Sequence, residues 1–195
     1  MAKKGISRDV VLTKAVEMIE RTGTPVLSMR ELAEELKIKT PSLYNHVKGV
    51  NDLLADVSRY AAEELRKKLL MAIAGKNGDD ALNALAGAYR NFAKEHIGLY
   101  KVTNSVSALP KTVSVEIGTL ISEPIFLVLS QYGLDEEQSI HWQRVLRSII
   151  HGFLSQEEAG FFQHCPLSVE ASYQVAVHCY IEGLHTEARG YHNVG

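Results

Sequence analysis

Six hydrogen-bonding side chains lie close together in one short segment of the sequence. They are Thr40, Ser42, Tyr44, Asn45, His46 and Lys48. Small hydroxyl and amide groups can donate and accept hydrogen bonds without bulk, as reading base edges in the ~12 Å wide major groove of DNA requires. A tyrosine, histidine or lysine beside them can reach bases or backbone phosphates. The segment therefore predicts contact with double-stranded DNA.

A capping box precedes this segment and opens the first of two short helices. Ser28 and Glu31 have the spacing S-x-x-E, so each side chain can satisfy a free backbone donor of the other residue. The helix is expected to end before a turn at Lys37–Lys39. A left-handed backbone at Lys37 would cost about 1–2 kcal/mol, because Cβ then crowds the following carbonyl oxygen.

The second short helix is predicted to end near Val47. Thr40 is expected as its N-cap and Pro41 as its first helical residue, because proline lacks an N–H that would have no helical partner there. Leu43 and Val47 are expected to face inward, which leaves the polar side chains exposed. Two short helices joined by such a turn form a helix-turn-helix, whose second helix enters the major groove.

The charge distribution agrees with DNA binding at the N-terminal end. The 195-residue chain has a formal net charge of −2, yet residues 1–50 carry nine Lys and Arg against six Asp and Glu. The rest of the chain is acidic. Lys3 and Lys4, in the N-terminal tail, are expected to add phosphate contacts.

The rest of the chain is predicted to be helical as well. Proline is rare, and no run shows the alternation of a strand between turn signals. Beyond the two short helices, helices are expected over about 7–22, 50–73, 79–94, 96–103, 111–131, 136–159 and 168–189, with Pro124 kinking or interrupting its helix. The fold class is therefore all-α with about nine helices, divided into a DNA-binding domain of 1–50 and a helical domain of 51–195.

At its N-terminal end the sequence resembles the DNA-binding domain of the TetR family of transcriptional regulators. The matching segments are Ser28–Ala33, Thr40–Val47 and Leu53–Leu54, within a resemblance that covers about residues 7–57. A second similarity, to the ligand-binding domains of some members, lies in Ile150–Phe153 and in Glu158–Phe162.

The resemblance implies a repressor that binds palindromic operator DNA as a homodimer and is released by a small-molecule inducer. It implies that the helices at about 136–159 and 168–189 pair with those of a second subunit. Carried over by position, and joined by the residues already discussed, the DNA-contacting set is Lys3, Lys4, Ser28, Arg30, Thr40, Pro41, Ser42, Tyr44, Asn45, His46 and Lys48.

Two positions depart from the family pattern. The turn of the family often has glycine where this chain has Lys37. Members also commonly place a lysine near the start of the fourth helix, where Val50 and Asn51 stand. Either Lys48 takes over that phosphate contact or the contact is missing.

Aromatic residues and one histidine of the second domain are the candidates for an inducer pocket. They are Tyr89, Phe92, Tyr100, Phe126, Trp142 and His151. Small-molecule pockets are mostly apolar with a few polar groups, which this set would supply. Each of these residues could equally belong to the ordinary core.

Other functional classes lack their sequence patterns. No glycine-rich phosphate loop, nucleophile elbow or metal-ligand spacing occurs, so neither an enzyme nor a cofactor or metal site is expected. No apolar run approaches the ~18 residues that span a bilayer, and no signal peptide is recognised, so we expect a cytoplasmic protein without a membrane partner. The main alternative is a helical protein-interaction module without sequence-specific DNA binding, which would place larger apolar side chains after Thr40.

Overall fold

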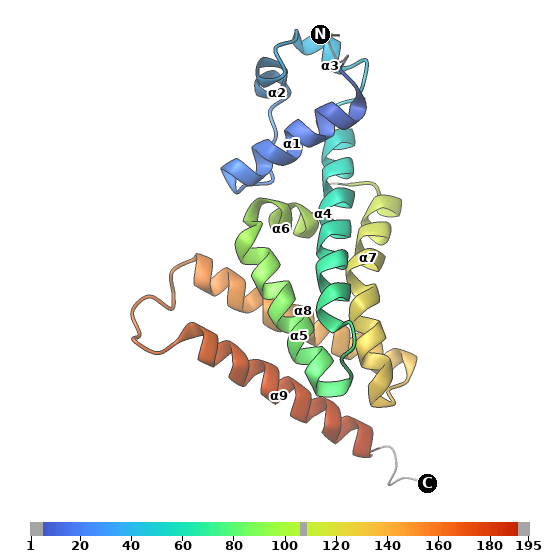
Figure 1. Ribbon diagram of the computed structural model, residues 1–195, viewed down its shortest axis with the longest axis vertical. Helices are drawn as coiled ribbons and strands as arrows, with labels where there is room; N and C mark the ends of the chain where they lie inside the picture. Colours follow the sequence, from blue (N-terminus) through green and yellow to red (C-terminus); the bar gives the residue numbers. More distant parts are fainter. Residues whose placement is uncertain (1–5, 106–108, 191–195) are drawn as a thin grey trace. The chain divides into compact units, whose positions relative to one another are not determined.

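The computed structural model describes residues 6–105 and 109–190, and all regular structure in these residues is helical (Figure 1). This confirms the all-α fold class. The elements are α1 (Arg8–Thr22), α2 (Met29–Glu35), α3 (Thr40–Leu43), α4 (Val50–Ile73), α5 (Gly78–Glu95), α6 (Ile97–Asn104), α7 (Lys111–Leu129), the 3-10 helix η2 (Ser130–Tyr132), α8 (Glu136–Glu158) and α9 (Val169–Gly190).

The long helices begin and end at local sequence signals. Ser7 caps α1, with its Oγ accepting a hydrogen bond from the N–H of Val10 at 3.3 Å. Gly23 ends the same helix in a left-handed conformation with φ of 63°, which glycine adopts without a Cβ clash. Asp135 and Gln138 form a complete capping box at the start of α8. These signals explain why the predicted helix bounds agree with the observed ones to within a few residues.

Helix α7 is more apolar than expected. Lys111–Tyr132 is 22 residues long with a hydropathy of 1.6, long and apolar enough to cross a membrane, so the expectation that no stretch approaches this is wrong. A core helix passes the same test, and 44% of the apolar window is buried. Its buried side chains recur at helical spacing, at Val113, Ile117, Ile121, Ile125 and Val128. Pro124 lies inside α7 without interrupting it.

Packing divides the chain into two compact units. The first contains the residues up to Glu64 together with Glu95–Leu120, and the second contains Leu65–Lys94 and the residues from Ile121 onward. Helices α4 and α7 contribute to both units. The predicted DNA-binding head thus shares its unit with α6 and the first half of α7. The functional division at residue 50 stays a prediction.

In the first unit, α6 packs closely against the C-terminal end of α1. A Cβ atom added at Gly98 would lie 2.2 Å from the backbone oxygen of Ile19 and 2.8 Å from its carbonyl carbon. Beside this contact, Nδ1 of His96 lies 3.2 Å from Oε1 of Glu20. Only a residue without a side chain allows the two backbones to come this close.

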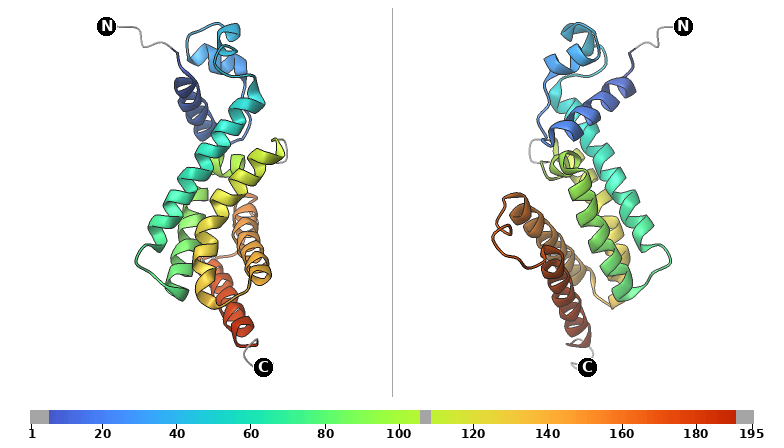
Figure 2. Two further views of the ribbon diagram at one scale, coloured as in Figure 1. Left: turned by 90° about the vertical axis from the view of Figure 1, so that its right-hand side faces the viewer. Right: turned by 60° about the vertical axis from the view of Figure 1, so that its left-hand side comes forward.

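In the second unit, α8 and α9 lie side by side (Figures 1 and 2). The Trp142 ring covers Gly183, where an added Cβ would lie 2.6 Å from the indole. The Tyr180 hydroxyl donates to the backbone oxygen of Trp142 at 2.8 Å. Trp142 therefore has a packing role between these two helices.

A buried arginine joins α5 to both of these helices. Arg90, whose side chain is 3% exposed, pairs with Glu157 of α8 at 2.8 Å and with Glu170 of α9. Its guanidinium carbon lies 4.8 Å from the centroid of the Tyr173 ring. Two carboxylates and an aromatic face thus compensate the burial of one positive charge.

Candidate nucleic-acid interface

Helix α2 forms the first half of the predicted helix-turn-helix. Ser28 Oγ accepts a hydrogen bond from the N–H of Glu31 at 3.3 Å, which confirms the predicted N-cap and one of the two bonds of the predicted capping box. Leu32 and Ala33 are buried and hold the helix on the first unit. Arg30 is exposed, and its Nε lies 2.9 Å from Glu34.

Helix α2 is followed by a turn whose central residue, Lys37, has a left-handed backbone conformation. The N–H of Ile38 donates to the Ala33 oxygen and the N–H of Lys37 to the Glu34 oxygen, both at 3.0 Å. These two bonds are the pair that defines a Schellman motif. Lys37 occupies its left-handed position with φ of 54°, the one non-glycine residue with positive φ in the described part of the chain. Lys37 thus has the left-handed backbone for which a strain energy is expected.

We expect Lys37→Gly to stabilise the chain by about 1 kcal/mol, because it removes the Cβ that is strained in this conformation. Lys37→Ala is the matched control, since it deletes the same charge and keeps the Cβ. Thermal unfolding of both variants measures the effect. If alanine raises the melting temperature as much as glycine does, the strain is not located in the backbone.

Helix α3 is shorter than predicted and starts one residue earlier. Lys39, with extended backbone and no side-chain cap bond, is the N-cap, so the expectation that Thr40 caps the helix is wrong. Thr40 is instead the first helical residue and Pro41 the second. The helix ends at Leu43, and the chain continues in a turn in which Val47 N–H donates to the Leu43 oxygen at 3.1 Å.

Two buried residues decide which side chains of this segment are exposed. Leu43 is fully buried and Val47 is 2% exposed, as predicted. The remaining side chains of Thr40–Lys48, which we call the recognition segment, therefore lie at or near the surface. Pro41, Tyr44, Asn45 and Lys48 are exposed, whereas Thr40, Ser42 and His46 are half-buried. Lys3 and Lys4 lie outside the described residues.

Sequence reasoning missed the residue that ties this segment to its neighbours. Arg8 of α1 donates from Nε to Asp56 of α4 at 2.7 Å and from Nη1 to the backbone oxygen of His46 at 3.3 Å. Its Nη2 lies 3.2 Å from Asp52. No local motif marks Arg8, because its partners are 38 to 48 residues away in the sequence.

Asp52 fixes the start of α4 beside the recognition segment. The backbone N–H of Lys48 donates to its carboxylate at 3.0 Å. This bond, together with the Arg8 guanidinium, holds the pKa of the Asp52 carboxyl below its ordinary value.

A pH dependence of stability follows from this lowered pKa. Asp52 stabilises the fold fully above the pKa it has in the unfolded chain, about 3.9, and this stabilisation is lost as the pH falls through the lower folded value. We expect Asp52→Asn to lower the free energy of unfolding at neutral pH, with the difference from wild type shrinking below about pH 4. Denaturant titrations across this range measure it, and a difference that is constant with pH would contradict the assignment.

The six predicted inducer residues do not gather around one described pocket. Tyr89, Phe92 and Tyr100 are buried, with 2–5% of each residue exposed. Phe126 is 37% exposed, and His151 is exposed on α8. Trp142 packs between α8 and α9, as described above. Their contact with an inducer stays a prediction.

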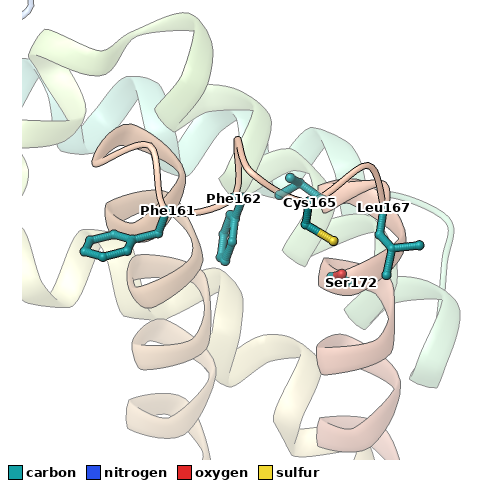
Figure 3. Close-up of a pocket in the computed structure, with 6 residues that line it drawn as sticks. Phe161, Phe162, Cys165, Leu167 and Ser172 are labelled. Atoms are coloured by element: carbon teal, nitrogen blue, oxygen red, sulfur yellow. The ribbon is translucent and has the colours of Figure 1, made fainter.

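A pocket of about 140 Å³ lies instead where α8 is joined to α9 (Figure 3). It is lined by Phe161, Phe162, Cys165, Leu167, Val169 and Ser172. None of the predicted inducer residues is among them. Among the described residues, no group of three or more His, Cys, Asp or Glu could hold a metal ion.

Comparison with known proteins identifies the family of this chain. Residues 82–180 match the family model described as "Tetracyclin repressor-like, C-terminal domain". An uncharacterized HTH-type transcriptional regulator from Mycobacterium tuberculosis is 34% identical over 158 residues, which is 80% of this chain and 72% of that protein. The chain belongs to the TetR family of transcriptional regulators.

Solved structures show that this TetR-family chain has the fold of its family. A protein with unknown function from Rhodococcus sp. RHA1 has a TM-score of 0.79 at 21% identity, over 94% of this chain and 98% of that one. The Streptomyces coelicolor TetR family protein ActR in complex with actinorhodin has a TM-score of 0.67 at 18% identity, over 94% and 99%. As the family match and the relative from Mycobacterium tuberculosis show, the TetR-family chain is a helix-turn-helix transcription regulator, whereas its DNA-contacting residues stay a prediction.

Proposed function

We propose that this TetR-family chain is a repressor that binds a palindromic operator as a homodimer and releases it when a small molecule binds. The observation that supports this most is the recognition segment. Leu43 and Val47 are packed inward, and small or planar polar groups such as Ser42 and Asn45 lie at or near the surface. Such groups can read base edges in the major groove. The large exposed side chain of the segment, Tyr44, carries a hydroxyl that can reach a base or a phosphate.

In this proposal the charged residues contact backbone phosphates and do not read bases. Lys48 is exposed at the end of the segment and is expected to neutralise a backbone phosphate, as are Lys3 and Lys4. Arg30 is exposed on α2 and is expected to contact DNA as well. These contacts position the protein on DNA without selecting a sequence. Because a transcription regulator of this family acts on DNA in the cytoplasm, we propose a cytoplasmic location. We propose no enzymatic activity.

Homodimerisation is proposed through α8 and α9. Apolar residues that recur at helical spacing on α9, such as Tyr173, Val177 and Leu184, are buried within the subunit and are 0–1% exposed. Other apolar residues on these helices remain exposed, with Val145 of α8 at 45% and Val175 of α9 at 63%. These are the residues expected to meet a second subunit, whose recognition helix would then lie about 34–36 Å away.

An inducer is proposed to bind within the C-terminal domain and to act through α4. ActR, which shares the fold, has been solved with actinorhodin. Helix α4 starts directly after the recognition segment and belongs to both units of this chain. A ligand that prefers one of two positions of α4 would change operator affinity, as allosteric coupling requires.

Selection of bound sequences from a random DNA pool tests the proposal. The expected result is one enriched near-palindromic motif, bound by two chains in sedimentation experiments. Metabolite screening for release of that DNA then tests the inducer. If no sequence is enriched above random DNA, the chain is a helical interaction module without sequence-specific DNA binding.

A further inference from the structure

Arg8 joins three separate pieces of the first unit. It lies in the first turn of α1, and its guanidinium contacts the backbone oxygen of His46 in the recognition segment at 3.3 Å. The same group contacts Asp52 and Asp56, one turn apart on α4, at 3.2 and 2.6 Å. Arg8 therefore adds a side-chain connection between the recognition segment and α4 to the bond between Lys48 N–H and Asp52.

A second arginine continues this connection to α7. The Asp56 carboxylate receives Arg8 on Oδ2, and its Oδ1 lies 3.4 Å from Nη1 of Arg59. Arg59 in turn donates from Nε to Glu116 of α7 at 2.8 Å. We call Arg8, Asp56, Arg59 and Glu116 the Arg8–Glu116 relay. All four residues belong to the first unit.

We propose that Arg8 is a positioning residue for the recognition segment and that the Arg8–Glu116 relay makes operator affinity sensitive to α7. The proposal rests on the DNA binding proposed above. Glu116 lies in the first half of α7, and the same helix continues into the second unit. A shift of α7 along its axis would move Glu116, and each carboxylate–guanidinium pair would pass part of that shift on to the His46 backbone.

The burial of these side chains sets the size of the expected effect. Asp56, at the centre of the relay, has a side chain that is 16% exposed, whereas Arg59 and Glu116 are 38% and 47% exposed. Exposed ion pairs each contribute little, so loss of the outer pair should change operator affinity by about two- to fivefold. Loss of Arg8, which makes three contacts, should have a larger effect of about tenfold.

The chain offers a matched control for the outer pair. Arg66 and Glu123 form a second ion pair between α4 and α7, two helical turns further along both helices and in the second unit. Glu116→Gln and Glu123→Gln therefore remove the same charge from the same helix. Any general effect of lost negative charge on DNA affinity is common to both variants.

The experiment measures equilibrium binding of the full chain to its selected DNA site by fluorescence anisotropy. Glu116→Gln is expected to weaken binding about two- to fivefold, and Glu123→Gln to leave it at or above the wild-type affinity. Both substitutions should change the melting temperature by similar amounts. A role of Glu116 in stability alone would therefore not give the two variants different affinities for DNA. Binding to random DNA should be equal in the two variants.

A double-mutant cycle tests the continuity of the relay. Arg8 and Glu116 are not in direct contact, so the effects of Arg8→Gln and Glu116→Gln on the dissociation constant would multiply if they were independent. The relay predicts instead that the double variant binds as Arg8→Gln does, within about twofold, because the relay is already broken at Arg8. Multiplying effects, or a Glu116→Gln variant that binds like Glu123→Gln, would overturn the relay. A wild-type chain that selects no DNA sequence would instead overturn the proposed function itself.

Discussion

Replacing Gly98 by alanine is expected to lower the melting temperature of this TetR-family chain by about 5–10 °C. The new Cβ would lie 2.2 Å from the backbone oxygen of Ile19, and no rotamer can relieve a clash made by Cβ itself. Helix α6 must then move away from α1, which opens one of the closest contacts in the first unit. Thermal unfolding followed by circular dichroism measures this loss.

Gly118→Ala is the matched control for this prediction. Gly118 lies in α7, within the same unit, and an added Cβ there meets nothing within 4 Å. Alanine is preferred over glycine in a helix interior by up to about 1 kcal/mol, so this variant is expected to be as stable as wild type or more stable. The same substitution thus has opposite effects at two helical glycines. Equal melting temperatures for the two variants would show that α6 can move away from α1 without a loss of stability.

Replacing Asn45 by alanine is expected to weaken binding to the selected DNA site about 10- to 100-fold, because one lost base contact costs on the order of 1–3 kcal/mol. Asn45 is exposed in the turn that follows α3, and its amide can pair with a base edge. Binding to random DNA should hardly change. Competition titrations with selected and random duplexes at one salt concentration separate the two affinities.

Lys48→Ala is the comparison for Asn45→Ala. A lysine that contacts only phosphate should lose affinity for all sequences equally, and the slope of log affinity against log salt should fall by about one. The two variants therefore differ in specificity as well as in strength. If Asn45→Ala weakens selected and random DNA by the same factor, Asn45 does not read a base.

The helices could largely be predicted from the sequence because their signals are local. The Ser28 cap and the apolar pair Leu43 and Val47 were recognised from spacing alone, and each is found as expected. The position of the α3 cap was wrong by one residue. Thr40 is a good capping residue by type, yet the extended backbone that precedes the helix belongs to Lys39. Cap preference and observed backbone can differ by this much at a short helix.

The contacts that position the site could not be predicted, because they join residues far apart in the sequence. Arg8 and Asp56 are 48 residues apart, and Arg90 and Glu170 are 80 apart. No periodicity or motif relates such pairs. The inducer residues posed a similar difficulty, since an aromatic side chain such as Trp142 has the same sequence signal in a pocket and in helix packing. Only the close approach to Gly183 assigns it to packing.

Sequence-specific DNA binding by the recognition segment is the central claim, and one titration tests it most directly. The full chain is added to its selected duplex and to a random duplex of equal length at the same salt concentration, and both affinities and the stoichiometry are read by fluorescence anisotropy. The account predicts saturation at two chains per selected duplex and an affinity at least about 10³-fold above that for random DNA. Equal affinity for the two duplexes would contradict it.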